Sequence, residues 1–88
     1  MTPNQKTILT KLAVARLHAP YEWRDAREFR SRELLHPLGA LFRMRRRGWV
    51  QSAKVGPYRT SLAWAITDAG IEALKKERGD TTDEPGNA

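Results

Sequence analysis

The sequence contains no cysteine and only two histidines, His18 and His36. Without cysteine, neither a disulfide framework nor a thiolate metal site can form, and a reducing, cytoplasmic setting is expected. No apolar run approaches the roughly 20 residues that a membrane span needs. The N-terminus lacks the charged and then apolar pattern of a signal peptide. We therefore expect a cytoplasmic protein without a membrane segment.

Motifs for catalysis and cofactor binding are also missing. The sequence has no glycine-rich phosphate loop, nucleophile elbow or metal motif. The two histidines lie at an expected helix end and on a basic face, and neither has ligand spacing to a carboxylate cluster. Three tryptophans (Trp23, Trp49 and Trp64) could form a ligand pocket or a stacking platform, but core packing explains them better. The sequence predicts neither an enzyme nor a cofactor.

Acidic residues are scarce in the central third of the chain. The whole sequence has 16 Lys and Arg against 10 Asp and Glu, a formal net charge of +6. Between Arg24 and Arg47, eight arginines accompany only three acids: Asp25, Glu28 and Glu33. Such a concentration of positive charge indicates nucleic acid as the first class of partner, ahead of an anionic membrane surface or an acidic protein.

The length of 88 residues suggests one domain with a small core. Hydrophobic periodicity and capping signals predict helices at 2–17 and 25–31, a third from Glu33 or after His36 up to Gly48, and a last one at 67–79. Pro37 fits the third helix only in its first turn or at a break. We expect residues 1–78 to form the domain and residues 79–88 to be a disordered acidic tail.

After Gly48 the period changes from helical to alternating. Residues 49–55 and 61–66 flank a turn containing Gly56-Pro57, a pattern typical of a β-hairpin. On the second strand, alternation places one set of residues toward the core (Leu62, Trp64 and Ile66) and the other outward (Ser61, Ala63 and Ala65). The aromatic segment 21–23 would suit a brief extended stretch packed on the sheet. The expected fold class is α+β, mainly α.

Four arginines fall within residues 43–47, before Gly48. On a helical wheel, the apolar residues form one arc, and the opposite face carries Arg32, His36, Gly39 and Arg43, flanked by Arg46 and Arg47. A solvated helix face would explain a generic basic helix. A small centre (Gly39, Ala40) with cationic edges instead favours close approach to a duplex. Arg45 lies over the buried side, where it should pair with Glu28 or Glu33 or run along Phe42.

Two stretches resemble a known family. "LFRMRRRGWV" looks like the end of the recognition helix of winged helix-turn-helix domains, and "AWAITDAGIEAL" looks like their passage from hairpin to helix. From Thr2 to about Arg78 the chain resembles these domains, as found in small bacterial, archaeal and phage regulators of the MarR and PadR groups. The resemblance implies three helices, a two-stranded hairpin wing and a C-terminal helix.

The resemblance also implies sequence-specific binding of double-stranded DNA, for transcriptional control or a phage function. It places Arg32, His36, Gly39, Ala40 and Arg43 in a major groove, Arg46 and Arg47 near phosphates, and the wing residues Lys54, Tyr58 and Arg59 on an adjacent minor groove or backbone. A winged-helix adaptor for an acidic partner protein is the alternative. RNA or single-strand binding, with Tyr58 or Trp49 stacking, is a third interpretation. A homodimer through the first or last helix stays open.

Overall fold

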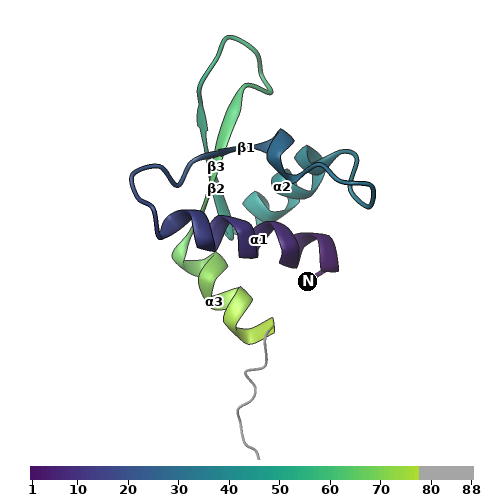
Figure 1. The fold of residues 1–88 in the computed structure, drawn as a ribbon, viewed down its shortest axis with the longest axis vertical. Helices are drawn as coiled ribbons and strands as arrows, with labels where there is room; N and C mark the ends of the chain where they lie inside the picture. Colours follow the sequence, from purple (N-terminus) through teal and green to yellow (C-terminus); the bar gives the residue numbers. More distant parts are fainter. Residues whose placement is uncertain (78–88) are drawn as a thin grey trace, which may run out of the picture.

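The computed structural model describes residues 1–77. The elements, in order, are α1 (Pro3–Arg16), β1 (Arg24–Asp25), the 3-10 helix η1 (Ala26–Phe29), α2 (Pro37–Arg46), β2 (Val50–Lys54), β3 (Leu62–Ile66) and α3 (Asp68–Glu77). Figure 1 shows the β2–β3 hairpin extending beyond a body formed by the helices. The chain is a small α+β fold. The expected end of the last helix at Arg78-Gly79 and the expected tail at 79–88 lie outside the described residues.

The sheet has three antiparallel strands in the order β1-β3-β2, so the two-stranded sheet expected from the sequence is wrong in strand count. β1 pairs Arg24 with Trp64 and Asp25 with Ala63. This strand begins just after the expected extended segment at 21–23. A two-residue strand is too short to show an alternating sequence pattern, so only its pairing with β3 identifies it as a strand.

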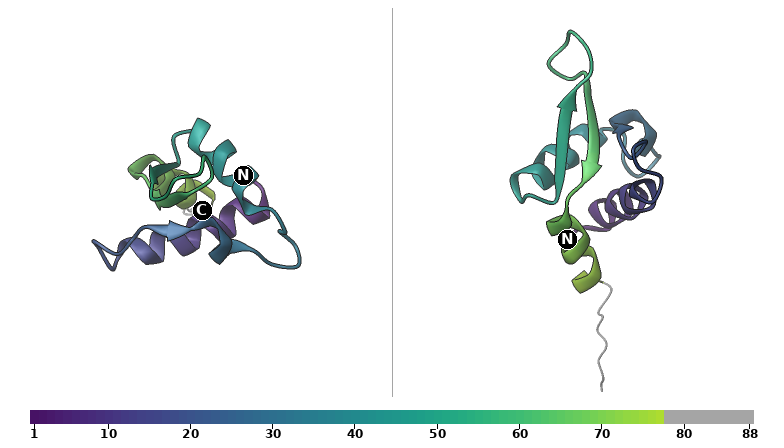
Figure 2. Two further views of the ribbon diagram at one scale, coloured as in Figure 1. Left: turned by 90° about the horizontal axis from the view of Figure 1, so that it is seen from above. Right: turned by 90° about the vertical axis from the view of Figure 1, so that its left-hand side faces the viewer.

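In the right-hand view of Figure 2, the hairpin stands above α3, with α1 to one side.

The start of α1 follows the capping signal in the sequence. The Thr2 hydroxyl accepts a hydrogen bond from the Gln5 backbone N–H at 3.1 Å, and the Gln5 side chain accepts one from the Thr2 N–H at 3.0 Å. Pro3 occupies the first turn, where a missing N–H costs nothing. The inward face of α1 buries Ile8, Leu9, Leu12 and Ala15. The expected first helix is therefore confirmed.

The second expected helix is a single 3-10 turn and ends earlier than predicted. Asp25 caps it as expected, with its carboxylate accepting from the Arg27 N–H at 2.8 Å. Glu28 accepts from the Asp25 N–H at 3.2 Å and completes a capping box. The turn closes at Phe29, which is buried, and Arg30 is already extended. Asp25 pairs in the sheet and Phe29, four residues later, is buried, so there is room for only one tight turn between them.

The segment 30–36 contains a turn rather than the start of a helix. The Ser31 and Leu34 backbones exchange hydrogen bonds at 2.9 and 3.2 Å, and the Ser31 hydroxyl accepts from the Leu34 N–H at 3.1 Å. α2 begins at Pro37, which settles its start in favour of the later position. Arg32 lies in this turn, so its expected place on the helix face is wrong.

α2 ends in a Schellman motif. Gly48 has φ +78°, a left-handed conformation that suits a residue without a Cβ. The Trp49 N–H donates to the Met44 carbonyl and the Gly48 N–H to the Arg45 carbonyl, both at 3.0 Å. The chain therefore turns sharply from α2 into β2, as the glycine predicted.

The core centres on Trp64, which is fully buried on the middle strand. The Phe42 ring meets it edge to face, with ring centroids 5.3 Å apart. The expected alternation on β3 fails at Ala65, which is fully buried instead of facing outward. β3 has a strand on each side and also contacts α1, so a small side chain on it is covered. The prediction of core packing for the tryptophans also fails for Trp23, which is 39% exposed, while Trp49 is half-buried against the core.

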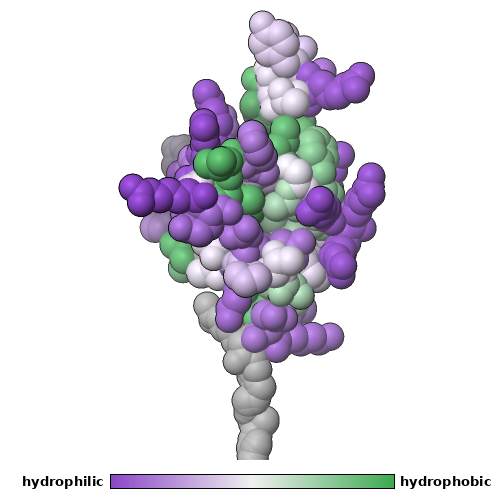
Figure 3. All heavy atoms as spheres, turned by 90° about the vertical axis from the view of Figure 1, so that its right-hand side faces the viewer, coloured by the Kyte–Doolittle hydropathy of each residue, from purple (hydrophilic) through white to green (hydrophobic). Residues whose placement is uncertain are grey.

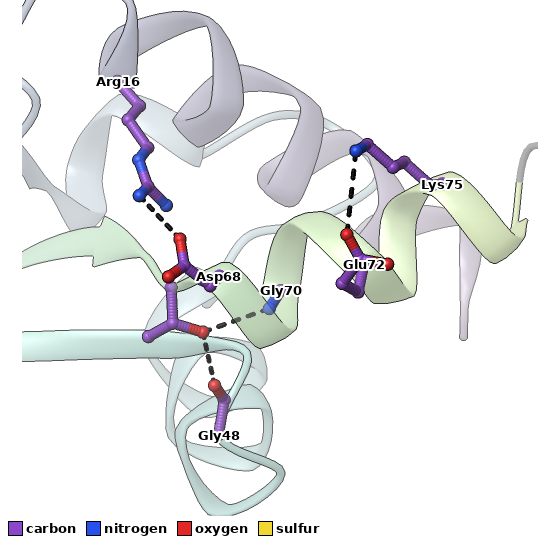
Figure 4. A network of polar contacts seen from close by, with 7 residues as sticks. Arg16, Gly48, Asp68, Gly70, Glu72 and Lys75 are labelled. Atoms are coloured by element: carbon purple, nitrogen blue, oxygen red, sulfur yellow. Dashed lines mark hydrogen bonds and ion pairs between the residues drawn. The ribbon is translucent and has the colours of Figure 1, made fainter.

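Thr67 joins the hairpin to α3 and to the end of α2 through hydrogen bonds. Figure 4 shows its partners Gly48 and Gly70 on either side of this junction. The Thr67 N–H donates to the Trp49 carbonyl at 3.0 Å, and its hydroxyl donates to the Gly48 carbonyl. The same hydroxyl accepts from the Gly70 N–H at 3.0 Å and so caps α3. Arg16 of α1 adds an ion pair to Asp68 at 2.7 Å. The Thr67 contacts hold α3 against the base of the hairpin, and the ion pair ties α3 to α1.

Candidate nucleic-acid interface

One side of α2 presents an exposed stripe of His36, Gly39, Arg43 and Arg46. His36 is the N-cap residue, and the others follow at spacings of three and four, so they share one helix face. The opposite side buries Leu41 and Met44. The structure thus brings together on the surface four of the residues predicted for this face: His36, Gly39, Arg43 and Arg46.

The residue at the centre of this stripe, Gly39, is smaller than the residues at its ends. Space beside Gly39 is open, since a Cβ placed there would meet no atom within 4 Å. Ala40 departs from the prediction because it is half-buried and packs against the core. The start of α1 lies beside it: Thr2, Asn4 and Gln5 share a surface hollow of about 390 Å³ with residues of α2. The exposed stripe is therefore centred on Gly39, with Ala40 at its edge.

Arg45 is directed toward the hairpin and away from the stripe. Its Nη1 donates to the Ser52 hydroxyl on β2 at 2.7 Å. Its guanidinium carbon lies 4.7 Å from the centre of the Phe42 ring and 5.7 Å from that of Trp64. The expected contact with Phe42 is confirmed, and pairing with Glu28 or Glu33 is wrong. Arg45 thus ties the end of α2 to β2.

The other cations of this region lack acidic partners among residues 1–77. The ion pairs of the described chain are Arg16–Asp68, Arg24–Glu28, Arg27–Asp25 and Lys75–Glu72. None of them includes Arg43, Arg46, Arg47, Lys54 or Arg59. The Arg47 guanidinium lies 5.1 Å from the centre of the Trp49 ring, a cation–π contact that supplies no full opposite charge. The positive potential of this side is therefore not cancelled locally.

The hairpin connection carries the predicted wing residues on an ordered loop. Lys54 ends β2, and Tyr58 and Arg59 lie in the connection; all three are exposed. The loop is closed by hydrogen bonds from Val55 N–H to the Ser61 carbonyl at 2.9 Å and from Ser61 N–H to the Tyr58 carbonyl at 3.0 Å. Figure 3 shows hydrophilic side chains projecting around the body, and a hairpin tip of mostly intermediate hydropathy with a hydrophilic group on one side.

A larger hollow of about 620 Å³ lies between the hairpin connection, η1 and the start of α2. It brings together two predicted residues, His36 and Tyr58, from segments that are far apart in the sequence. It also includes Arg27 and Arg30, which sequence reasoning did not single out. Their signal was the spacing: in a 3-10 turn, residues three apart lie on one side, so half-buried Ala26 and buried Phe29 share one side and leave Arg27 on another. Arg30 follows the turn directly, with an extended backbone.

Asp25 and Arg27 form the titratable pair of this region. Arg27 Nη2 lies 3.1 Å from Asp25 Oδ2, and Nε donates to Oδ1 at 3.2 Å. These side-chain hydrogen bonds, with that from the Arg27 backbone, lower the pKa of the Asp25 carboxyl from its ordinary value of 3.8. The same pair raises the pKa of Arg27. Both groups therefore stay charged, and the guanidinium is held in a defined orientation.

Residues 1–77 contain no cluster of three or more potential metal ligands and no helix that is both long and apolar enough to cross a membrane. Comparisons with protein-family models, with curated proteins and with solved structures give no match to this chain. Its function is therefore inferred from its own charge and geometry.

Proposed function

We propose that this chain is a winged helix-turn-helix domain that binds double-stranded DNA sequence-specifically in the cytoplasm. The observation that carries the proposal is the exposed stripe on α2, with a small residue at its centre and uncompensated arginines along it. In this proposal α2 enters the major groove, and the β2–β3 wing contacts the adjacent minor groove or backbone.

The arrangement of the elements supports this proposal. A short turn (η1) precedes the exposed basic helix, and a hairpin whose tip extends beyond the body follows it. The third strand is compatible with a winged helix, because β1 adds to the edge of β3 without covering the hairpin tip. The stretch "AWAITDAGIEAL" contains Thr67, which caps α3, and Gly70, which lets α3 pack closely against Trp49. These contacts give a physical reason for the threonine and the glycine in that stretch.

Each group has a distinct task in this proposal. Arg43 can donate two hydrogen bonds to the O6 and N7 of a guanine, the commonest specific contact in a major groove. Gly39 lets the helix backbone approach the base edges. Four further cations (Arg46, Arg47, Lys54 and Arg59) contact phosphates, which position the domain without reading sequence. His36, the N-cap residue of α2, contacts the groove edge in this proposal.

Selection of bound duplexes from a random pool tests the proposal. We expect an enriched motif, and two inverted copies at fixed spacing would show that the protein binds as a homodimer. A transcriptional or phage role would then follow from where the motif lies. If no motif is enriched and a stoichiometric acidic protein is captured after nuclease treatment, the domain is an adaptor and the DNA proposal is wrong.

A further inference from the structure

The hollow between the wing and the start of α2 differs in character from the α2 stripe. Its lining combines two cations, Arg27 and Arg30, with the Asp25 carboxylate that pairs with Arg27. It also includes the apolar side chains of Leu35 and Leu38 and the ring of Tyr58. Leu35 is 55% exposed and Tyr58 is 72% exposed, although both are large. A surface that alternates cationic and apolar groups suits a ligand that alternates anionic and less polar parts. The sugar-phosphate strand of a nucleic acid has that composition.

The two arginines are arranged differently. The Asp25 carboxylate holds Arg27 by two of its guanidinium nitrogens, which leaves Nη1 free of that pair. Arg30 is exposed and takes part in none of the ion pairs of residues 1–77. Arg30 therefore offers a full positive charge, while Arg27 offers an oriented donor whose charge is partly offset. Both positions suit an anion that approaches from the hollow.

The position of the hollow connects it to the proposed function, on which this inference rests. If α2 occupies a major groove and the wing occupies the adjacent minor groove, the sugar-phosphate strand that separates the two grooves must pass between them. We propose that this strand lies in the hollow, with Arg30 contacting one phosphate and Arg27 the neighbouring one. Tyr58 and Leu35 pack against the intervening sugars. These contacts fix the distance between helix and wing on the duplex and read no bases.

A scan with methylphosphonates tests the contact. Each substitution removes the charge of one phosphate of the selected duplex and leaves the bases unchanged. With the natural chain, we expect affinity to fall at one or two neighbouring positions on one strand, between the motif contacted by α2 and the wing. Arg30→Gln should lower affinity about tenfold and reduce the slope of log affinity against log salt by about one. A methylphosphonate at the matching position should then cause no further loss.

Controls separate this contact from general effects of charge and folding. Lys76→Gln removes one exposed positive charge from α3 and should keep the full methylphosphonate pattern. Arg30→Lys keeps a charge and should recover part of the affinity, and urea unfolding shows whether each variant is folded. If the methylphosphonate losses are the same in folded Arg30→Gln and Arg27→Gln as in the natural chain, the inference is wrong although DNA binding stands. If the natural chain binds no duplex, the proposed function and this inference both fall.

Discussion

Gly70 lies directly against the carbonyl oxygen of Trp49, so that a Cβ at this position would overlap that oxygen and the Ile66 side chain. The Thr67 cap draws α3 this close to the hairpin base. We predict that Gly70→Ala lowers the free energy of unfolding by about 1–3 kcal/mol, because the backbone must move to admit the methyl group. Urea unfolding measures the loss.

Gly39→Ala is the matched control for this prediction. Gly39 is also in a helix, but nothing lies within 4 Å of its absent Cβ. The substitution should therefore raise stability by about 0.5–1 kcal/mol through helix propensity. Equal destabilisation by the two substitutions would contradict the packing described for Gly70.

Gly48 should tolerate few replacements, because its φ of +78° lies in the left-handed region. We expect Gly48→Ala to cost about 1–2 kcal/mol of stability. Gly48→Asn should cost less, since asparagine adopts this conformation more readily than alanine. Thermal or urea unfolding of the two variants checks the order, and a more stable alanine variant would contradict the Schellman end of α2.

Arg45 should contribute to the stability of the fold rather than to contacts with DNA phosphates. Arg45→Ala removes the Ser52 hydrogen bond and the stacking on Phe42, so we expect it to lower stability by about 1 kcal/mol. Arg46→Ala should leave stability within about 0.5 kcal/mol of the natural chain and reduce the salt slope of DNA binding instead. Urea unfolding and binding titrations at several salt concentrations distinguish the two roles. The reverse pattern would mean that Arg45 faces the duplex.

Arg43 and Arg59 should differ in what they recognise. Arg43→Ala is expected to cost about 1–3 kcal/mol on the selected duplex and to relax base preference, since a groove contact reads sequence. Arg59→Ala, on the wing, should weaken binding to all duplexes alike. With about six to eight phosphates contacted, affinity should fall about 10³-fold or more between about 50 and 200 mM salt. Equal losses on selected and random DNA for Arg43→Ala would count against its base-reading role.

Protonation of Asp25 should account for part of the stability that the fold loses in acid. Because Arg27 lowers the folded-state pKa of this carboxyl below 3.8, its ionised form stabilises the fold above that pH. The contribution is lost as the pH falls through the folded-state pKa. Asp25→Asn keeps a capping side chain but has no charge, so its stability should fall less than that of the natural chain between about pH 5 and about pH 2. Identical acid profiles in urea unfolding would show that the pair contributes nothing.

Much of the candidate site could be predicted because its signals are local. The cap at Thr2, the proline at 37 and the glycine at 48 act on their own helix ends, and each is found as expected. The exposed face of α2 followed from helical spacing once its start was known. Arg32 was misplaced because a helix start at Glu33 or at Pro37 fits the same periodicity, and only the Ser31–Leu34 turn separates the two.

The sequence by itself determined the order of the helices and the hairpin and the cationic character of α2, because caps, periodicity and turn residues act over a few positions. The tertiary structure decided what depends on distant partners. It pairs β1 with β3, buries Ala65 and turns Arg45 toward Ser52. It also brings Arg27, Arg30 and Tyr58 around one hollow. Such relationships depend on packing between segments far apart in the chain, for which local spacing carries no signal.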